Sequence, residues 1–182
     1  MIEIEVKFEI SNIRKIQQRL KRIGAKKISK VLQQDISFDD KNETFMKQDK
    51  LLRVRKEGDN VILAFKSKKK KARFKEAEEI EIKVSDFKKT KGILKRIGFY
   101  PMGEFRKTRE RWDFKNSEIL IDQTALGNFL EIEGTKKEIE EIIKLLELDS
   151  KKRSSKTYHE LYKEYCKKKG IKFHPRYIVL PK

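Results

Sequence analysis

Like-charged side chains occur in pairs, two residues apart, at several places in the chain. The acidic pairs are Glu3 with Glu5, Glu79 with Glu81, and Glu131 with Glu133; the basic pairs are Arg53 with Arg55, and Lys107 with Arg109. Residues two apart on a β-strand point to the same face and lie about 7 Å from each other. Like charges so close together repel unless a group of opposite charge lies between them. A divalent cation and a chain of phosphates would together satisfy both kinds of pair.

The residue types match these two ligands. Hard Mg²⁺ or Mn²⁺ prefers carboxylate oxygen and commonly binds through one or two carboxylates plus substrate phosphates. The candidate metal ligands are Glu3, Glu5, Asp122, Glu131 and Glu133. Arginine presents a fork that matches two phosphate oxygens, and lysine supplies a compact point charge. The candidate phosphate-binding residues are Lys7, Arg53, Arg55, Lys66, Lys107 and Arg109. The alternative is that these strands form ordinary ion pairs with one another across an exposed sheet.

The elements that carry these side chains are recognised by an alternation of apolar and charged residues with a period of two, which predicts β-strands. In residues 2–10 the apolar side chains share one face and the charged side chains share the other. The same alternation marks segments 52–55, 62–66, 79–84, 107–112, 119–122 and 129–133, and segment 35–38 brings the total to about eight strands. We therefore predict an α+β fold with a mostly antiparallel sheet that curls into a barrel, with the charged face inside.

Two strand–helix units repeat within the chain. The pattern Glu-Ile-Glu-Val-Lys of residues 3–7 returns as Glu-Ile-Glu-Ile-Lys at 79–83, and both following helices end in Leu-Lys-Arg-Ile-Gly. Gly24 and Gly98 stand where a left-handed C-cap is expected. A third helix is expected after Thr135, because Glu138 follows it at capping-box spacing. Three helices would cover the apolar face of the sheet.

Composition narrows the class of protein. A chain of 182 residues suits one domain, or one domain with a tail. The formal net charge of +18 attracts polyanions, and phosphate-bearing molecules are the first candidates for a partner. One cysteine excludes a disulfide framework, and the absence of a P-loop or G-x-G-x-x-G motif means that side chains must hold the phosphates. No apolar run suggests a membrane span or a signal peptide, so we expect no membrane partner and a cytoplasmic location.

A longer series of motifs resembles one known family. In chain order these are Glu3-x-Glu5-x-Lys7, the segment Gln34–Asp39, Leu52-Arg53-Val54-Arg55, Phe65-Lys66, Glu79-x-Glu81, Lys107-x-Arg109, Asp122 with Gly127, Phe129-x-Glu131-x-Glu133, and Thr157-Tyr158-x-Glu160-Leu161. The series resembles the CYTH family, named for CyaB-type (class IV) adenylyl cyclases and thiamine triphosphatases, within the triphosphate tunnel metalloenzymes. The resemblance covers residues 1–165 and leaves 166–182 as a C-terminal tail.

This resemblance implies a closed antiparallel barrel of eight strands, with helices packed outside and a charged tunnel that binds a triphosphate with Mg²⁺ or Mn²⁺. The resemblance implies that the candidate carboxylates bind the metal and that the candidate lysines and arginines bind the phosphates. We expect Glu5, Lys7 and Arg109 to be catalytic. Many members carry an arginine just before the middle Glu-x-Glu, where this chain has Ala77 and Glu78. Arg73 is the candidate substitute for that phosphate contact.

Two reactions fit such a tunnel. In a cyclase, the ribose 3′-hydroxyl of ATP attacks the α-phosphorus, giving cyclic AMP and pyrophosphate. In a triphosphatase, water attacks the terminal phosphorus of tripolyphosphate, thiamine triphosphate or a nucleoside triphosphate. The CyaB-like layout, with the Gln34-Asp35 segment and Tyr158, favours the cyclase. Nucleic-acid binding has only the net charge in its favour, so we expect it to be nonspecific at most. A homodimer is compatible with the sequence.

Overall fold

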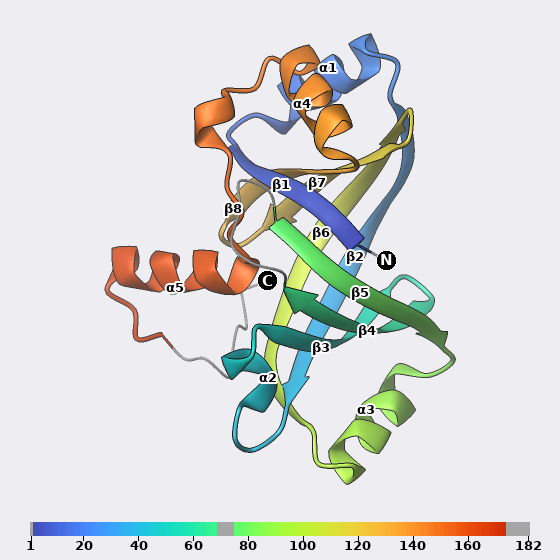
Figure 1. Ribbon diagram of the computed structural model, residues 1–182, viewed down its shortest axis with the longest axis vertical. Helices are drawn as coiled ribbons and strands as arrows, with labels where there is room; N and C mark the ends of the chain where they lie inside the picture. The colour runs from blue at the N-terminus through green and yellow to red at the C-terminus, as the bar shows by residue number, and fades with distance from the viewer. Residues whose placement is uncertain (1, 69–74, 174–182) are drawn as a thin grey trace.

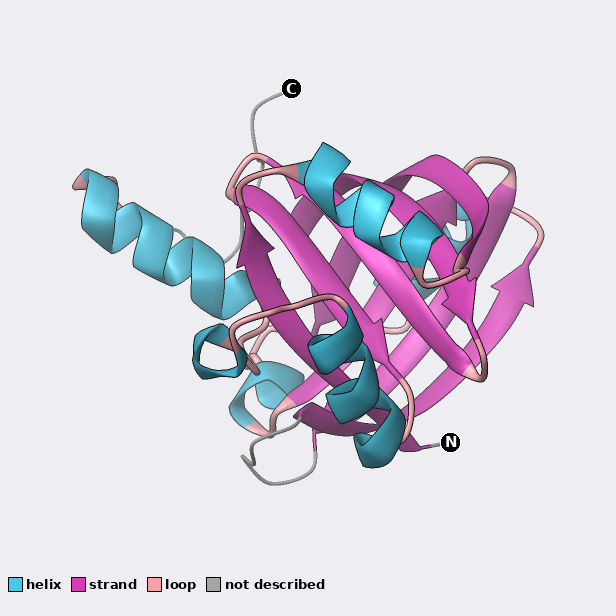
Figure 2. Cartoon of the chain, turned by 90° about the horizontal axis from the view of Figure 1, so that it is seen from above, coloured by secondary structure: helices cyan, strands magenta, loops and turns pink. Residues whose placement is uncertain are grey.

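The computed structural model describes residues 2–68 and 75–173, and the side chains of residues 4–67 and 76–173. Eight antiparallel strands close into a barrel in the order β1-β5-β4-β3-β2-β6-β7-β8. Figure 2 shows the curved sheet with the helices around it. The strands are β1 (Ile2–Ile10), β2 (Lys26–Asp39), β3 (Lys50–Glu57), β4 (Asn60–Lys68), β5 (Lys75–Val84), β6 (Tyr100–Phe114), β7 (Ser117–Thr124) and β8 (Gly127–Glu133). The predicted closed eight-stranded barrel is confirmed.

Helices lie outside the barrel. They are α1 (Ile13–Arg22), α2 (Thr44–Lys47), α3 (Phe87–Arg96), α4 (Lys136–Leu145) and α5 (Tyr158–Lys169), with a 3₁₀ turn at Ser150–Lys152. Figure 1 shows α1 and α4 together at one end of the long axis and α3 at the other, while α5 projects from the side. In the described part of the chain, no helix is long and apolar enough to cross a bilayer.

Helix packing decides which face of the sheet points inward. The side chains of Leu20 on α1 and Ile139 on α4 are fully buried against outward-facing apolar residues of β1, β6, β7 and β8. Leu94 on α3 packs in the same way against Ile36 of β2 and Val54 of β3. Because the helices cover the apolar face from outside, the charged face of each strand is directed into the barrel. The predicted orientation of the charged face is therefore confirmed.

The ends of the helices follow the sequence signals. Gly24 and Gly98 adopt φ angles of +82° and +95°, a region that costs a side-chain-bearing residue energy. Thr135 and Glu138 form the reciprocal capping box that starts α4. Helix α5 continues through residue 166, where the tail was expected to begin, and Cys166 is buried.

Two strands are longer than the sequence pattern predicted. Strand β2 extends over residues 26–39 rather than 35–38, and β6 over residues 100–114 rather than 107–112. The two pair with each other from Lys26 opposite Asp113 to Asp39 opposite Tyr100. Polar and charged residues stand on both faces of their outer portions, so the period-two alternation is weak there. Long-range backbone pairing sets their length instead.

Candidate active site

The inside of the barrel contains a cavity of about 700 Å³ lined by side chains of both charges. Nine of the predicted site residues line it, namely Glu5, Lys7, Arg53, Arg55, Lys66, Lys107, Arg109, Glu131 and Glu133. The alternation on five different strands therefore converges on one enclosed space. Ordinary ion pairs across an exposed sheet, the alternative considered from the sequence, do not describe this arrangement.

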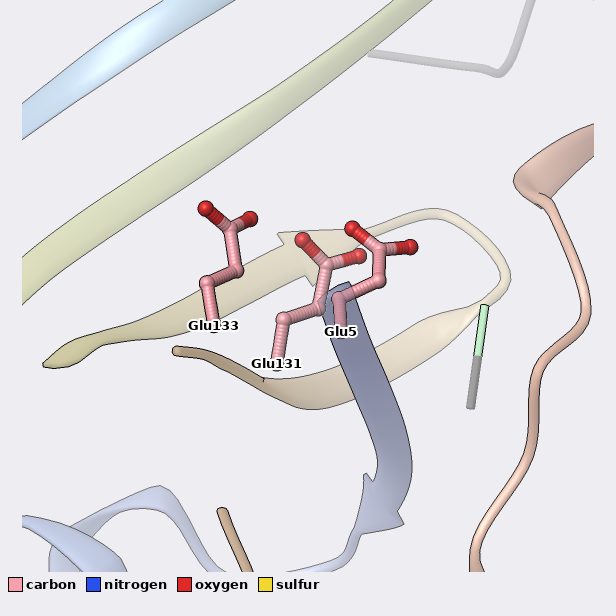
Figure 3. A group of neighbouring side chains, drawn as sticks. All are labelled: Glu5, Glu131 and Glu133. Atoms are coloured by element: carbon pink, nitrogen blue, oxygen red, sulfur yellow. The ribbon is translucent and has the colours of Figure 1, made fainter. Parts of the chain in front are cut away.

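Three carboxylates form a compact cluster in one wall of the cavity. Glu5 lies on β1 and Glu131 and Glu133 on β8, and each offers an oxygen within 4.8 Å of those of the other two (Figure 3). The cause is strand register, which sets Glu5 opposite Glu133. Three hard oxygen donors so close together suit Mg²⁺ or Mn²⁺. The backbone of Glu3 pairs with that of Ala77, but the Glu3 side chain lies outside the described part of the structure.

Asp122 on β7 is not a member of this cluster, although the sequence grouped it with the metal ligands; it is joined to Glu131 through Arg109. Its carboxylate is fully buried and accepts hydrogen bonds from Lys107 Nζ (2.8 Å), from Arg109 Nε and Nη2 (both 2.6 Å) and from the Tyr158 hydroxyl (2.6 Å). Four donors occupy the two oxygens. In this structure Asp122 is a counter-ion for Lys107 and Arg109.

The carboxylate cluster shares Arg109 with Asp122 and also contacts Lys7. Glu131 Oε1 lies 2.9 Å from Lys7 Nζ, and Glu131 Oε2 accepts a hydrogen bond from Arg109 Nη2. Burial alone would raise the pKa of Glu131, but Lys7, Arg109 and Lys107 hold that pKa well below its usual range. Burial, reinforced by the neighbouring Arg109, lowers the pKa of Lys107 to about 8 against the opposing effect of Asp122. Glu131 therefore stays ionised at neutral pH and can serve a metal.

A second set of ion pairs forms the opposite wall. Asp35 accepts hydrogen bonds from Arg55 Nε (2.7 Å) and Nη2 (3.1 Å) and lies 3.7 Å from Arg53 Nη1. Arg53 also contacts Glu79 and Glu81, at 3.5 and 3.2 Å, and Lys66 Nζ lies 2.8 Å from Glu79. Burial would raise the pKa of Asp35, but Arg53 and Arg55 hold it well below its ordinary value.

Some residues of the site were not identified from the sequence. Asp35, Glu79, Glu81 and Tyr158 all line the cavity, although none was predicted to be a site residue. The acidic pair on β5 carried the same two-residue spacing as the others, so its spacing was a usable signal. The role of Asp35 depends on its register opposite Arg55, which the sequence does not reveal. Arg73 lies outside the described residues.

The CYTH domain family model matches residues 1–160. The chain belongs to the CYTH family. A protein named "Putative adenylate cyclase MJ0240", from Methanocaldococcus jannaschii, is 38% identical over 148 residues, which cover 81% of this chain and 85% of that protein. The solved structure of PH1012 from Pyrococcus horikoshii OT3 superposes with a TM-score of 0.77 at 30% identity, covering 87% of this chain and 98% of that one. HpAC1 from Hippeastrum shares the fold at 18% identity, with a TM-score of 0.57 and coverage of 96% and 90%.

Family membership agrees with the geometry of the cavity. CYTH proteins act on small molecules that carry a triphosphate and generally use divalent metals. The cavity of this CYTH chain contains both buried cations and a cluster of three carboxylates, the residue types that suit a triphosphate and a divalent metal. The resemblance of the sequence motifs to the CYTH family is therefore confirmed.

The pairing of Asp35 predicts a pH dependence of stability. Because the pKa of Asp35 is lower in the folded protein, its pairing stabilises the fold above its ordinary pKa of 3.8, and this contribution is lost as the pH falls below that value. We expect the difference in free energy of unfolding between the wild type and Asp35→Asn to be constant from roughly pH 5 to 8. It should then shrink by at most about 1.4 kcal/mol for each pH unit below 3.8.

Urea unfolding of both proteins in EDTA, at several pH values down to about 3, measures this difference directly. The subtraction removes the contributions of carboxylates that do not interact with Asp35 or its arginine partners. A difference that stays the same down to about pH 3 would contradict the assigned ion pairs.

Proposed function

We propose that this chain is a divalent-metal-dependent enzyme that binds a triphosphate inside the barrel and converts ATP to cyclic AMP and pyrophosphate. The observation that carries the proposal is the meeting of the Glu5, Glu131 and Glu133 cluster with Lys7 and Arg109 in one cavity. Metal ligands and phosphate-binding cations thus stand side by side, as a metal–triphosphate complex requires.

Binding would exchange partners within the cavity. The cations are held by carboxylates of the protein, such as Arg55 by Asp35 and Lys7 by Glu131. A triphosphate offers these cations a replacement anion, and a metal offers the carboxylates a replacement cation. Glu5, Glu131 and Glu133 would hold Mg²⁺ or Mn²⁺, which supplies Lewis-acid stabilisation of phosphate charge. For Glu131 and Lys7, this exchange keeps both buried charges compensated.

The residues of the chain would then act by position and charge. Arg53 and Arg55 can bind phosphate oxygens from one wall, while Lys107 faces them from β6. Lys7 and Arg109, each less than a tenth exposed, lie against the carboxylate cluster, where they can neutralise charge on the reacting phosphorus. Charges act more strongly in such an enclosed site than in bulk water. These contacts support Glu5, Lys7 and Arg109 as the catalytic residues.

Hydrolysis is the second candidate reaction. The name of the archaeal relative MJ0240 supports cyclisation. The Hippeastrum protein is described as a "putative adenylyl cyclase" that reveals a dominant triphosphatase activity, and its likeness to this chain is one of fold. The same barrel is therefore compatible with water as the nucleophile. Which phosphorus faces the nucleophile decides between the two reactions.

Product analysis tests the proposal. Purified protein is incubated with ATP, thiamine triphosphate or tripolyphosphate, in Mg²⁺ or Mn²⁺, and the products are separated. We expect cyclic AMP and pyrophosphate from ATP, and no product in EDTA until metal is restored. If the products are ADP and inorganic phosphate, the enzyme is a triphosphatase and not a cyclase. The absence of turnover with every substrate in both metals would contradict an enzymatic role.

Replacing one metal-side carboxylate tests the cluster. Glu5→Gln keeps the size of the side chain but removes a charged ligand, so we expect turnover to fall by about two orders of magnitude or more. The matched control is Glu78→Gln, which makes the same change on an exposed side chain of β5. Initial rates at saturating metal measure both variants. Equal rates for Glu5→Gln and the control would show that Glu5 is not a metal ligand.

Substitution of Arg55 tests whether this wall of the cavity binds phosphate. Arg55→Ala should weaken binding of tripolyphosphate roughly 10- to 100-fold, because a charge-assisted hydrogen bond contributes about 1.5–3 kcal/mol. The substitution also leaves Asp35 without its closest partner, so the variant is compared in an Asp35→Asn background, where that charge is absent. Calorimetric titration measures the affinity. An unchanged affinity in the Asp35→Asn background would exclude Arg55 from the phosphate site.

A further inference from the structure

Tyr158 closes part of the cavity and is held there by several independent contacts. It is the first residue of α5, whose start is fixed by a reciprocal capping box between Thr157 and Glu160. The segment that precedes Tyr158 is joined to β1 by two backbone hydrogen bonds between Lys7 and Ser154, of 3.0 and 2.8 Å. The beginning of α5 is thus tied to the strand that carries Glu5 and Lys7.

The ring of Tyr158 lies in an aromatic cluster. It stacks on Phe105 with ring centroids 4.6 Å apart and meets Phe129 edge-on at 5.5 Å. Phe105 and Phe129 are both buried. Such paired aromatic contacts restrict the orientation of the ring.

Two of the proposed phosphate-binding lysines lie over that ring. Lys7 Nζ is 4.0 Å from the ring centroid and Lys107 Nζ is 4.9 Å from it, both within range of a cation–π interaction. Lys7 Nζ also donates a hydrogen bond of 3.3 Å to the carbonyl oxygen of Lys156, two residues before Tyr158. One aromatic ring therefore restrains two ammonium groups that come from different strands.

The hydroxyl of Tyr158 makes a further contact with the same network. It donates to Asp122 Oδ2 at 2.6 Å, and Asp122 in turn accepts from Lys107 and Arg109. Enclosure by the cavity wall, together with Glu131 and Asp122, raises the pKa of the phenol well above its ordinary value. Tyr158 therefore remains a hydrogen-bond donor throughout the neutral pH range.

We propose that Tyr158 is a positioning residue for the triphosphate: its ring orients Lys7 and Lys107, and its hydroxyl fixes Asp122 and, through it, Arg109. The inference rests on the proposed function, since it assumes that these cations bind phosphate. It assigns Tyr158 a part in ligand affinity in addition to its packing. The ring, which faces both lysines, carries most of the effect.

The test compares two substitutions by calorimetric titration of tripolyphosphate, both in EDTA and in Mg²⁺, because metal would release Lys7 and Arg109 from Glu131. Tyr158→Phe keeps the ring, and Asp122 keeps its bonds from Lys107 and Arg109, so affinity should stay within about threefold of wild type. Tyr158→Leu removes both cation–π contacts and should weaken binding about 5- to 30-fold. Tyr158→Met, with its adaptable side chain, repeats the comparison if the leucine variant does not fold.

The matched control is Tyr162→Leu, one turn further along α5. Tyr162 packs against the same aromatic cluster and against Phe173, with ring centroids 5.7 Å apart. We expect this variant to bind tripolyphosphate as the wild type does. The inference is overturned if Tyr158→Leu also binds like wild type, if Tyr158→Phe is as weak as Tyr158→Leu, or if Tyr162→Leu weakens binding equally. Failure of the wild type to bind tripolyphosphate in Mg²⁺ as well as in EDTA would instead contradict the proposed function.

Discussion

Mutual neutralisation of charges inside a closed sheet is the constraint on which this structure depends. Charged side chains on the inner face of a barrel are enclosed by the strands, and a buried charge without a partner is far more costly than one in water. In this chain, cross-strand ion pairs such as Asp35 with Arg55 and Glu131 with Lys7 neutralise the buried charges. The apolar faces then point outward, and α1, α3 and α4 cover much of them, while Ile80 and Ile82 of β5 stay exposed.

The barrel and most of its lining could be predicted from the sequence because side-chain direction in a strand is a local property. The alternation in β1 fixes that Glu5 and Lys7 share a face whatever the strand pairs with. The partner of each charge is not local, since it depends on register between strands. For this reason the roles of Asp35 as partner of Arg55, and of Asp122 as counter-ion of Arg109, emerged only from the structure.

The same ion pairs explain how one cavity can serve two ligands of opposite charge. Glu131, which pairs with Lys7 and Arg109, is one of the carboxylates that would bind metal, and the two cations that it would release are among those that would bind phosphate. The three-glutamate cluster and the cations beside it are therefore parts of one electrostatic unit. Tyr158 belongs to this unit as well, because it joins Lys7, Lys107 and Asp122 to the first turn of α5.

The most direct test of this account is a crystal structure from crystals grown with Mn²⁺ and tripolyphosphate, in which anomalous scattering locates the metal. The account predicts an anomalous peak coordinated by Glu5, Glu131 and Glu133, and phosphate oxygens in contact with Arg55 and Lys107 inside the barrel. Metal and phosphate bound only on the outer surface, with the pairs between Asp35 and Arg55 and between Glu131 and Lys7 still intact, would contradict it.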